Sequence, residues 1–228
     1  MANRTDPDFD RDGALLFGGV LSPVEAASLA GRLEPQITGR PGKRLQVDPD
    51  LAALLAAHGA VGAVAASLIG TGATPVRAVL FDKSPDANWI VAWHQDRTIP
   101  VRERREAPEF GPWSLKDGIQ HVAPPITVLE GMVTLRLHLD PVDATNAPLV
   151  VSAGSHRLGY VPAGAAAMRA AEGPALVCLA EAGDVWAYST PILHMSARSA
   201  GDRRRRVLQV DYAASPLPAP LEWRGIEA

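Results

Sequence analysis

The chain has 228 residues, of which 47% are hydrophobic and 21% are charged, and its formal net charge is −3. This composition is typical of a folded globular protein and argues against a disordered chain. Without a basic excess, the sequence does not predict a surface for nucleic acid or for an anionic membrane. The single cysteine, Cys178, excludes an internal disulfide and a multi-cysteine metal site.

The N-terminus, MANRTDPDFDRDG, is polar and acidic, unlike a secretory signal. A lone cysteine also suits a reducing compartment, so we expect a cytoplasmic protein. Residues 51–70 form an apolar stretch of about membrane-spanning length. They are mostly alanine and glycine, however, and Gly59 and Gly62 interrupt a helix, so the stretch predicts two short buried helices instead of a membrane span.

Helices are predicted in the first part of the chain. Ser22, Pro23 and Glu25 form a capping box with proline at the first helical position, and apolar residues then recur at helical spacing. Asp48 and Pro49 begin a second helix, which runs into the alanine-rich stretch. Residues 1–75 are therefore expected to be mostly helical.

From residue 76 the pattern changes to short strands rich in Val and Leu and bounded by turn residues. The expected strands are 76–83, 89–96, 132–140, 149–152, 175–179, 185–188, 192–196 and 204–212. One helix around 163–171 interrupts them. Many short strands predict a sandwich or a closed barrel over residues 76–215, within a single domain of residues 1–228.

Residues 97–125 form a long polar stretch that is rich in proline and has no strand periodicity. Loops of this length in compact domains are either disordered or functional. The position directly after a candidate metal motif favours an active-site lid. Arg97, Trp113 and His121 are then candidate substrate contacts, although solvent exposure or packing within the protein would explain them as well.

The candidate metal motif is His94-Gln95-Asp96 at the end of an extended run. Residues two apart in a strand point to the same face, so His94 and Asp96 project together. A second histidine would complete a 2-His-1-carboxylate triad with open coordination positions, and His194 in the run TPILHMS is the best candidate. The triplet alone also arises by chance, as a surface histidine beside a capping aspartate.

Four arginines, residues 203–206, lead into the last expected strand. Because alternate residues face opposite sides, Arg203 and Arg205 share one face and Arg204 and Arg206 share the other. One pair can remain solvated while the other reaches inward, where a guanidinium matches a carboxylate. The alternative is a solvated charge cluster or a phosphate patch.

These features together resemble the phytanoyl-CoA dioxygenase family of Fe(II)/2-oxoglutarate-dependent oxygenases. The resemblance covers residues 9–212 and includes DRDGALLFGGVLSPVEAASL, WHQD, residues 137–159, GDVWAYSTPILHMS and the arginine-led last strand. It implies a mainly β fold, a double-stranded β-helix of the jelly-roll type with N-terminal helices packed on it. It further implies that His94, Asp96 and His194 bind Fe(II), and that Arg205, helped by Ser196, binds the far carboxylate of 2-oxoglutarate.

The implied reaction uses O₂ to convert 2-oxoglutarate into succinate and CO₂, and hydroxylates or otherwise oxidises an unactivated C–H bond of a small-molecule substrate. Related halogenases carry a small residue in place of the metal carboxylate, so Asp96 favours oxidation over halogenation. The competing hypothesis is a non-catalytic jelly-roll module that binds a metal or ligand, since fold alone does not settle function.

The chain departs from the family pattern in places. Ala147 follows Asn146 where the family usually has glycine, and Ala153 replaces a proline. Arg136 stands where many relatives carry a tryptophan near 2-oxoglutarate. Together with Thr134 it either faces the barrel interior, where it would touch 2-oxoglutarate or an anionic substrate, or lies on the solvated face of an edge strand. Lys83 is expected to be an exposed strand end.

Overall fold

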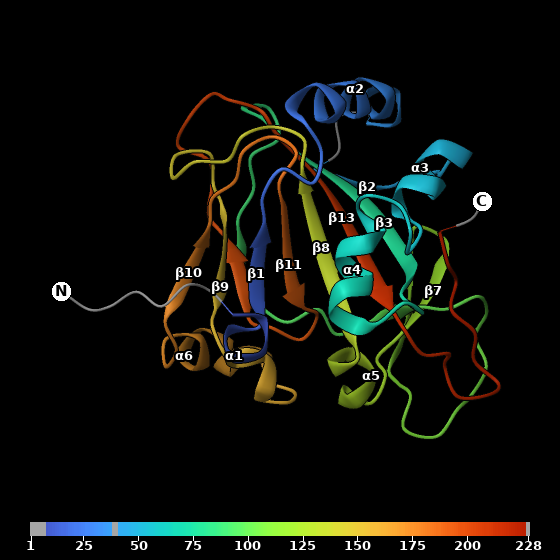
Figure 1. Cartoon of the computed structure of the whole chain (residues 1–228). Coiled ribbons are helices and arrows are strands. Elements are labelled where there is room, and N and C mark those ends of the chain that lie inside the picture. The colour runs from blue at the N-terminus through green and yellow to red at the C-terminus, as the bar shows by residue number, and fades with distance from the viewer. Residues whose placement is uncertain (1–7, 38–40, 227–228) are drawn as a thin grey trace.

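Two antiparallel β-sheets form the body of the protein (Figure 1). The computed structural model describes residues 8–37 and 41–226, so the N-terminal segment that argued against a secretory signal lies largely outside the described residues. The larger sheet has the order β1 (Ala14–Phe17), β11 (Val185–Ser189), β8 (Met132–His138), β13 (Arg205–Ala213), β3 (Thr74–Lys83), β2 (Gly42–Arg44). The smaller sheet has the order β10 (Ala175–Cys178), β9 (Leu149–Ser152), β12 (His194–Ser196), β4 (Val91–His94).

The larger sheet is buried on both faces, which β8 shows most clearly. Every residue of β8 is buried, and successive side chains point to opposite faces. Leu135 and Leu137 pack into the apolar core beneath the N-terminal helices. Arg136 faces the smaller sheet and lines a cavity there. Because β8 lies between β11 and β13, the alternative of a solvated edge strand for Arg136 is wrong.

Three N-terminal helices cover the outer face of the larger sheet: α2 (Pro23–Leu33), α3 (Pro49–Leu55) and α4 (Gly62–Ile69) (Figure 1). The predicted capping box is present, because the Ser22 hydroxyl accepts from the Glu25 amide and the Glu25 carboxylate accepts from the Ser22 amide. The apolar stretch divides into α3 and α4, as expected. No helix in the described part of the chain is long and apolar enough to cross a membrane.

The turn between α3 and α4 depends on glycine at position 59. A Cβ atom there would lie 2.1 Å from the carbonyl oxygen of Ala53, well inside van der Waals contact. Only glycine permits the two helices to approach this closely. The remaining short helices are α1 (Phe9–Asp12), η1 (Glu34–Gln36), α5 (Ile126–Glu130), η2 (Ser155–Arg157), η3 (Ala163–Ala165) and α6 (Ala166–Ala170).

The eight expected strands are present with small shifts at their ends, and the mainly β architecture is confirmed as a double-stranded β-helix. Two strands of the larger sheet were not predicted, β1 and β2, which extend its two edges. Both are too short to show a clear alternation of apolar and polar residues.

The expectation that residues 97–125 lack strands is wrong. They contain a three-stranded sheet in the order β5 (Ile99–Pro100), β7 (Ile119–Val122), β6 (Trp113–Lys116). Asp117 and Gly118 form the tight turn between β6 and β7, both with positive φ, as a two-residue hairpin of this type requires. The sheet has its own apolar core, which includes Ile99 and Val122.

Candidate metal centre

His94, Asp96 and His194 come together between the two sheets. One ligand atom from each lies within 4.8 Å of the others. The two histidines are distant in sequence, but β4 and β12 are neighbours, and His94 stands directly opposite His194 in their antiparallel register. Asp96 follows two positions after His94, so the alternation of the extended chain returns its carboxylate to the same side. The predicted triad is therefore a cluster in space.

Backbone carbonyls hold both imidazoles in one tautomer. His94 Nδ1 lies 2.9 Å from the oxygen of Ala92, and His194 Nδ1 lies 3.0 Å from the oxygen of Ile192. Because a carbonyl can only accept, each Nδ1 carries the proton and each Nε2 keeps its lone pair. Burial lowers the pKa of His194 to about 4, which keeps this ring neutral at neutral pH. Two histidine imidazoles and a carboxylate are a donor set that fits Fe(II).

Arg77 on β3 compensates the charge of the site. Its Nη2 lies 3.3 Å from Asp96 Oδ2, and its Nε lies 2.5 Å from Asp211 Oδ2 on the neighbouring strand β13. Burial alone would raise the pKa of Asp96, but Arg77 and the two imidazoles hold that pKa below its ordinary value. The carboxylate is therefore ionised before any metal binds.

The cluster lies in a cavity of about 200 Å³. Four of its polar lining residues, Arg77, Arg136, Arg205 and Gln209, come from the neighbouring strands β3, β8 and β13 of the larger sheet. Gln209 of β13 stands between Val79 of β3 and Arg136 of β8. The lining residues are Arg77, Val79, Phe81, Trp89, Val91, His94, Asp96, Arg136, Leu149, His194, Met195, Ser196, Arg205 and Gln209.

Two buried guanidinium groups face this cavity without a carboxylate partner among the described residues. Arg205 donates to the carbonyl of Ala147, which also accepts from the Ser196 hydroxyl at 3.1 Å. Arg136 donates to Gln209 Oε1 at 2.7 Å. Burial and the charge of Arg136 lower the pKa of Arg205 to about 9. A buried positive charge is costly unless an anion compensates it, so this end of the cavity is suited to an anionic ligand.

Lys83 adds a third cation, and the expectation that it is exposed is wrong. Its side chain is 1% exposed. Its Nζ donates to Ser196 Oγ at 3.3 Å and to the carbonyls of Ala197 and Trp89. Lys83 stands opposite Arg205 in the register of β3 and β13, so both enter the same interior space. Burial, together with Arg205 and Arg136, lowers the pKa of Lys83 to about 8.

Thr134 lies behind the cavity and does not line it. It is buried on β8, and its hydroxyl donates to Asp211 Oδ1 at 3.1 Å. Asp211 in turn pairs with Arg77. Thr134 is thus linked to the metal cluster through this chain of polar contacts.

The three candidate substrate contacts from residues 97–125 also lie outside the metal cavity. The Arg97 guanidinium is placed over the ring of Tyr160, 5.7 Å from its centre. Trp113 packs against the core of the three-stranded sheet, with Arg104 over its ring. His121 is fully buried on β7 and receives a hydrogen bond from Arg44.

Sequence reasoning did not identify Arg77, Lys83 or Gln209 as parts of the site. Each is a polar residue at an alternate position of a strand that is otherwise mostly apolar, and this pattern was the available signal. Ala147 was noted only as a departure from the family. Its φ of 60° lies in the left-handed region, which explains the glycine usual at this position, and its carbonyl accepts from both Arg205 and Ser196.

Comparisons with known proteins agree with this geometry. The family model described as phytanoyl-CoA dioxygenase matches residues 9–207. No protein among the curated sequences matches the chain.

Several solved structures share the fold. The epimerase SnoN, in complex with Fe³⁺, alpha ketoglutarate and nogalamycin RO, matches with a TM-score of 0.65 and 20% identity over 96% of this chain and 84% of its own. AviO1 from Streptomyces viridochromogenes Tue57 matches with a TM-score of 0.59 and 22% identity over 92% of this chain and 95% of its own. HygX from Streptomyces hygroscopicus, with nickel and 2-oxoglutarate bound, matches with a TM-score of 0.61 and 16% identity over 90% of this chain and 84% of its own.

Proposed function

The chain belongs to the phytanoyl-CoA dioxygenase family of Fe(II)/2-oxoglutarate-dependent oxygenases, and from this premise we propose that His94, Asp96 and His194 hold its ferrous ion. When bound, the iron supplies the activation of O₂ that couples the conversion of 2-oxoglutarate into succinate and CO₂ to the oxidation of a substrate C–H bond. The observation that carries the assignment is the convergence of three ligand atoms in one cavity with the buried guanidinium of Arg205, which has no carboxylate partner among the described residues.

Each protein group has a defined task in this proposal. The carbonyls of Ala92 and Ile192 fix the two imidazoles, so that both Nε2 lone pairs are available to the metal. Arg77 holds the Asp96 carboxylate in place and keeps it charged. Preorganised ligands of this kind lose little conformational freedom when the metal binds.

We assign the cationic part of the cavity to 2-oxoglutarate. Arg205 offers a planar fork to the far carboxylate, and the Ser196 hydroxyl offers a second hydrogen-bond donor once it leaves Ala147. Arg136 and Lys83 make the surroundings strongly positive, which suits a dianion. Thr134 acts indirectly, through the Asp211 carboxylate that orients Arg77.

The substrate in this proposal is a small molecule, and residues 97–125 cover it within a single domain of residues 1–228. The β6–β7 turn supports this role, because Asp117 and Ile119 line a second cavity that shares Arg77 with the metal cavity. Contacts from Arg97, Trp113 and His121 would require this segment to move relative to the barrel. The lone buried Cys178 is consistent with our proposal of a cytoplasmic location.

Succinate formation from 2-oxoglutarate tests the proposal. The protein, reconstituted with Fe(II) and supplied with O₂, is expected to form succinate slowly even without substrate. His94→Ala and His194→Ala should abolish this activity. Arg205→Gln should raise the KM for 2-oxoglutarate at least about tenfold, corresponding to about 1.4 kcal/mol. Arg203→Gln removes the same charge from an exposed neighbour that pairs with Asp143, and is the matched control.

Two outcomes would contradict the proposal. Undiminished succinate formation in His94→Ala would place the metal elsewhere. Stoichiometric metal binding by the wild type, without succinate formation under any condition, would favour the non-catalytic binding module.

A further inference from the structure

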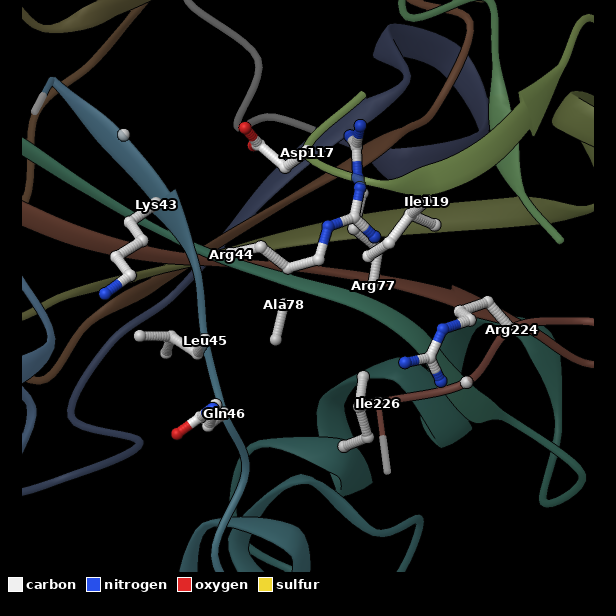
Figure 2. Close-up of a pocket in the computed structure, with 12 residues that line it drawn as sticks. Lys43, Arg44, Leu45, Gln46, Arg77, Ala78, Asp117, Ile119, Arg224 and Ile226 are labelled. Carbon is white, nitrogen blue, oxygen red and sulfur yellow. The ribbon is translucent and has the colours of Figure 1, made fainter. Parts of the chain in front are cut away.

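A second cavity, of about 450 Å³, shares the lining residue Arg77 with the metal cavity. Figure 2 shows the residues that line this second cavity. It lies between the edge of the larger sheet at β2 and β3, the turn that joins β6 to β7, and the C-terminal segment around Arg224. Arg77 lines both cavities, so the residue that holds Asp96 is a shared wall of the two spaces. The volume is within the usual range for a site that binds a small molecule.

The charged lining of this cavity is strongly unbalanced. Lys43, Arg44, Arg77 and Arg224 line it, whereas Asp117 is the one carboxylate among its lining residues. The charge of Arg77 is met by two aspartates outside this cavity. The excess of positive charge therefore includes Lys43 and Arg44. Figure 2 shows Arg44 extending toward Arg77 and Ile119, with Arg224 on the opposite side of the space.

Arg44 is the central residue of this arrangement. It stands opposite Val79 in the register of β2 and β3, so its side chain leaves the sheet on the barrel-facing side, where Val79 lines the metal cavity. Among the described residues its guanidinium forms no ion pair. It donates instead to Nε2 of His121 at 2.8 Å.

His121 orients Arg44 without neutralising it. Its Nδ1 donates to the Ile119 carbonyl at 3.0 Å, which leaves Nε2 as the acceptor for Arg44. Burial lowers the pKa of His121 to about 4, so the ring is neutral at neutral pH. Burial and the charge of Arg77 also lower the pKa of Arg44. An anion bound in the cavity would compensate the buried charge of Arg44 and offset its repulsion from Arg77.

We propose that this cavity binds the anionic group, a carboxylate or a phosphate ester, of the substrate whose C–H bond is oxidised. This inference rests on the proposed function, because the substrate would extend from Arg44 past Arg77 to the metal. Leu45, Ile119 and Ile226 supply apolar surface to the same cavity, which suits an organic anion with an apolar body better than a free inorganic ion. Arg44 is then a specificity-determining residue, because a planar fork selects a carboxylate or phosphate.

A ligand-observed NMR titration with benzoate and benzamide tests this inference, because the two probes have nearly the same shape and differ in charge. The full chain is used under anaerobic conditions, both alone and with saturating Fe(II) and 2-oxoglutarate. We expect saturable binding of benzoate at least about tenfold tighter than of benzamide, and a loss of at least about tenfold in Arg44→Gln. Arg44→Lys keeps the charge but not the fork and should bind with intermediate affinity.

Two matched controls locate the binding. Arg169→Gln removes a charge from an exposed ion pair on α6 and should leave benzoate affinity unchanged. Saturating Fe(II) and 2-oxoglutarate, which would fill the Arg205 end of the metal cavity, should also leave Arg44-dependent benzoate binding unchanged. Equal affinity for the two probes, equal affinity of wild type and Arg44→Gln, or loss of benzoate binding when Fe(II) and 2-oxoglutarate are added would each overturn the inference.

The two proposals can fail separately. Arg44-dependent binding of benzoate by a protein that forms no succinate would leave the anion site standing without the oxygenase reaction. Succinate formation by a protein that does not discriminate benzoate from benzamide would retain the reaction and overturn the anion site.

Discussion

Arg77 and Asp96 form an ion pair at the boundary of two cavities, with Arg77 Nη2 3.3 Å from Asp96 Oδ2. The same guanidinium pairs with Asp211, which lies opposite Arg77 in the register of β3 and β13. Asp96, the proposed metal ligand, thus contacts Arg77, and Arg77 is in turn held by Asp211. This arrangement has consequences for stability as well as for metal binding.

Replacing Arg77 by methionine should lower the free energy of unfolding by about 3 kcal/mol, because it leaves the buried Asp211 carboxylate without a counter-charge. The double variant Arg77→Met/Asp211→Asn removes both charges and should recover part of this loss. Urea unfolding of the metal-free protein measures both values. A loss in Arg77→Met as small as that of the exposed Arg203→Gln, within about 0.5 kcal/mol, would show that the pair is not important for stability.

Lys83 should make the affinity for 2-oxoglutarate dependent on pH. Its lowered pKa means that it loses its proton as pH rises through about 8, so the cavity loses a positive charge and binds the dianion more weakly. We expect the Kd of 2-oxoglutarate to rise about fivefold across this range, corresponding to about 1 kcal/mol. An anaerobic titration of the Fe(II)-loaded protein measures it.

In Lys83→Met this dependence should disappear. Lys116→Met, at an exposed lysine whose Nζ donates to the Thr98 hydroxyl, should retain it. A wild-type Kd that is constant across this range would contradict a role of Lys83 in binding 2-oxoglutarate.

His121 should make the protein sensitive to acid. Its pKa is about 4 in the folded protein and about 6.5 in the unfolded chain, so between these values the unfolded chain binds the additional proton. Stability therefore falls as pH falls through this window, by about 1.4 kcal/mol per pH unit for one proton. His121→Gln should reduce the measured slope by this amount.

Denaturant unfolding at a series of pH values within this window measures the slope. His58→Gln is the control, because His58 is exposed on the protein surface. An identical slope in wild type and His121→Gln would show that His121 is already protonated in the folded protein.

The architecture was largely predictable because the central strands alternate. β8 and β13 carry apolar residues on the helix-facing side and polar residues on the barrel-facing side, and this period of two is visible in the sequence. The metal cluster was predictable for the same reason, since His94 and Asp96 share one face. Strand order was not, because the pairing of β3 with β13 brings together residues from opposite ends of the barrel sequence.

The parts that were missed depend on such pairing. The role of Arg77 could not be predicted, because it depends on ion pairs with Asp211 and Asp96, which lie on other segments. Lys83 is buried because Arg205 and Ser196 surround it, although a lysine at the end of a strand is usually solvated. For residues 97–125 a local signal did exist, the Asp117-Gly118 turn, and the prolines around it obscured the hairpin.

Ala147 should carry measurable backbone strain. Its φ of 60° lies in the left-handed region, which costs a residue with a Cβ atom about 1 kcal/mol. Glycine avoids that cost, but it loses more conformational entropy when the chain folds. Ala147→Gly should therefore raise the free energy of unfolding by about 0.5 kcal/mol. In the neighbouring loop Ala153 does not have a positive φ, so Ala153→Gly should lower stability instead. Destabilisation by both substitutions would contradict the strain at Ala147.

The most direct test of the metal centre is the visible absorption of the anaerobic protein after addition of Fe(II) and 2-oxoglutarate. Chelation of 2-oxoglutarate to iron held by His94, Asp96 and His194 predicts a charge-transfer band that saturates at one iron per chain. The band should be absent in His94→Ala and in Asp96→Ala. No band in the folded wild type, or a band of full intensity in either variant, would contradict the assignment of these residues as the iron ligands.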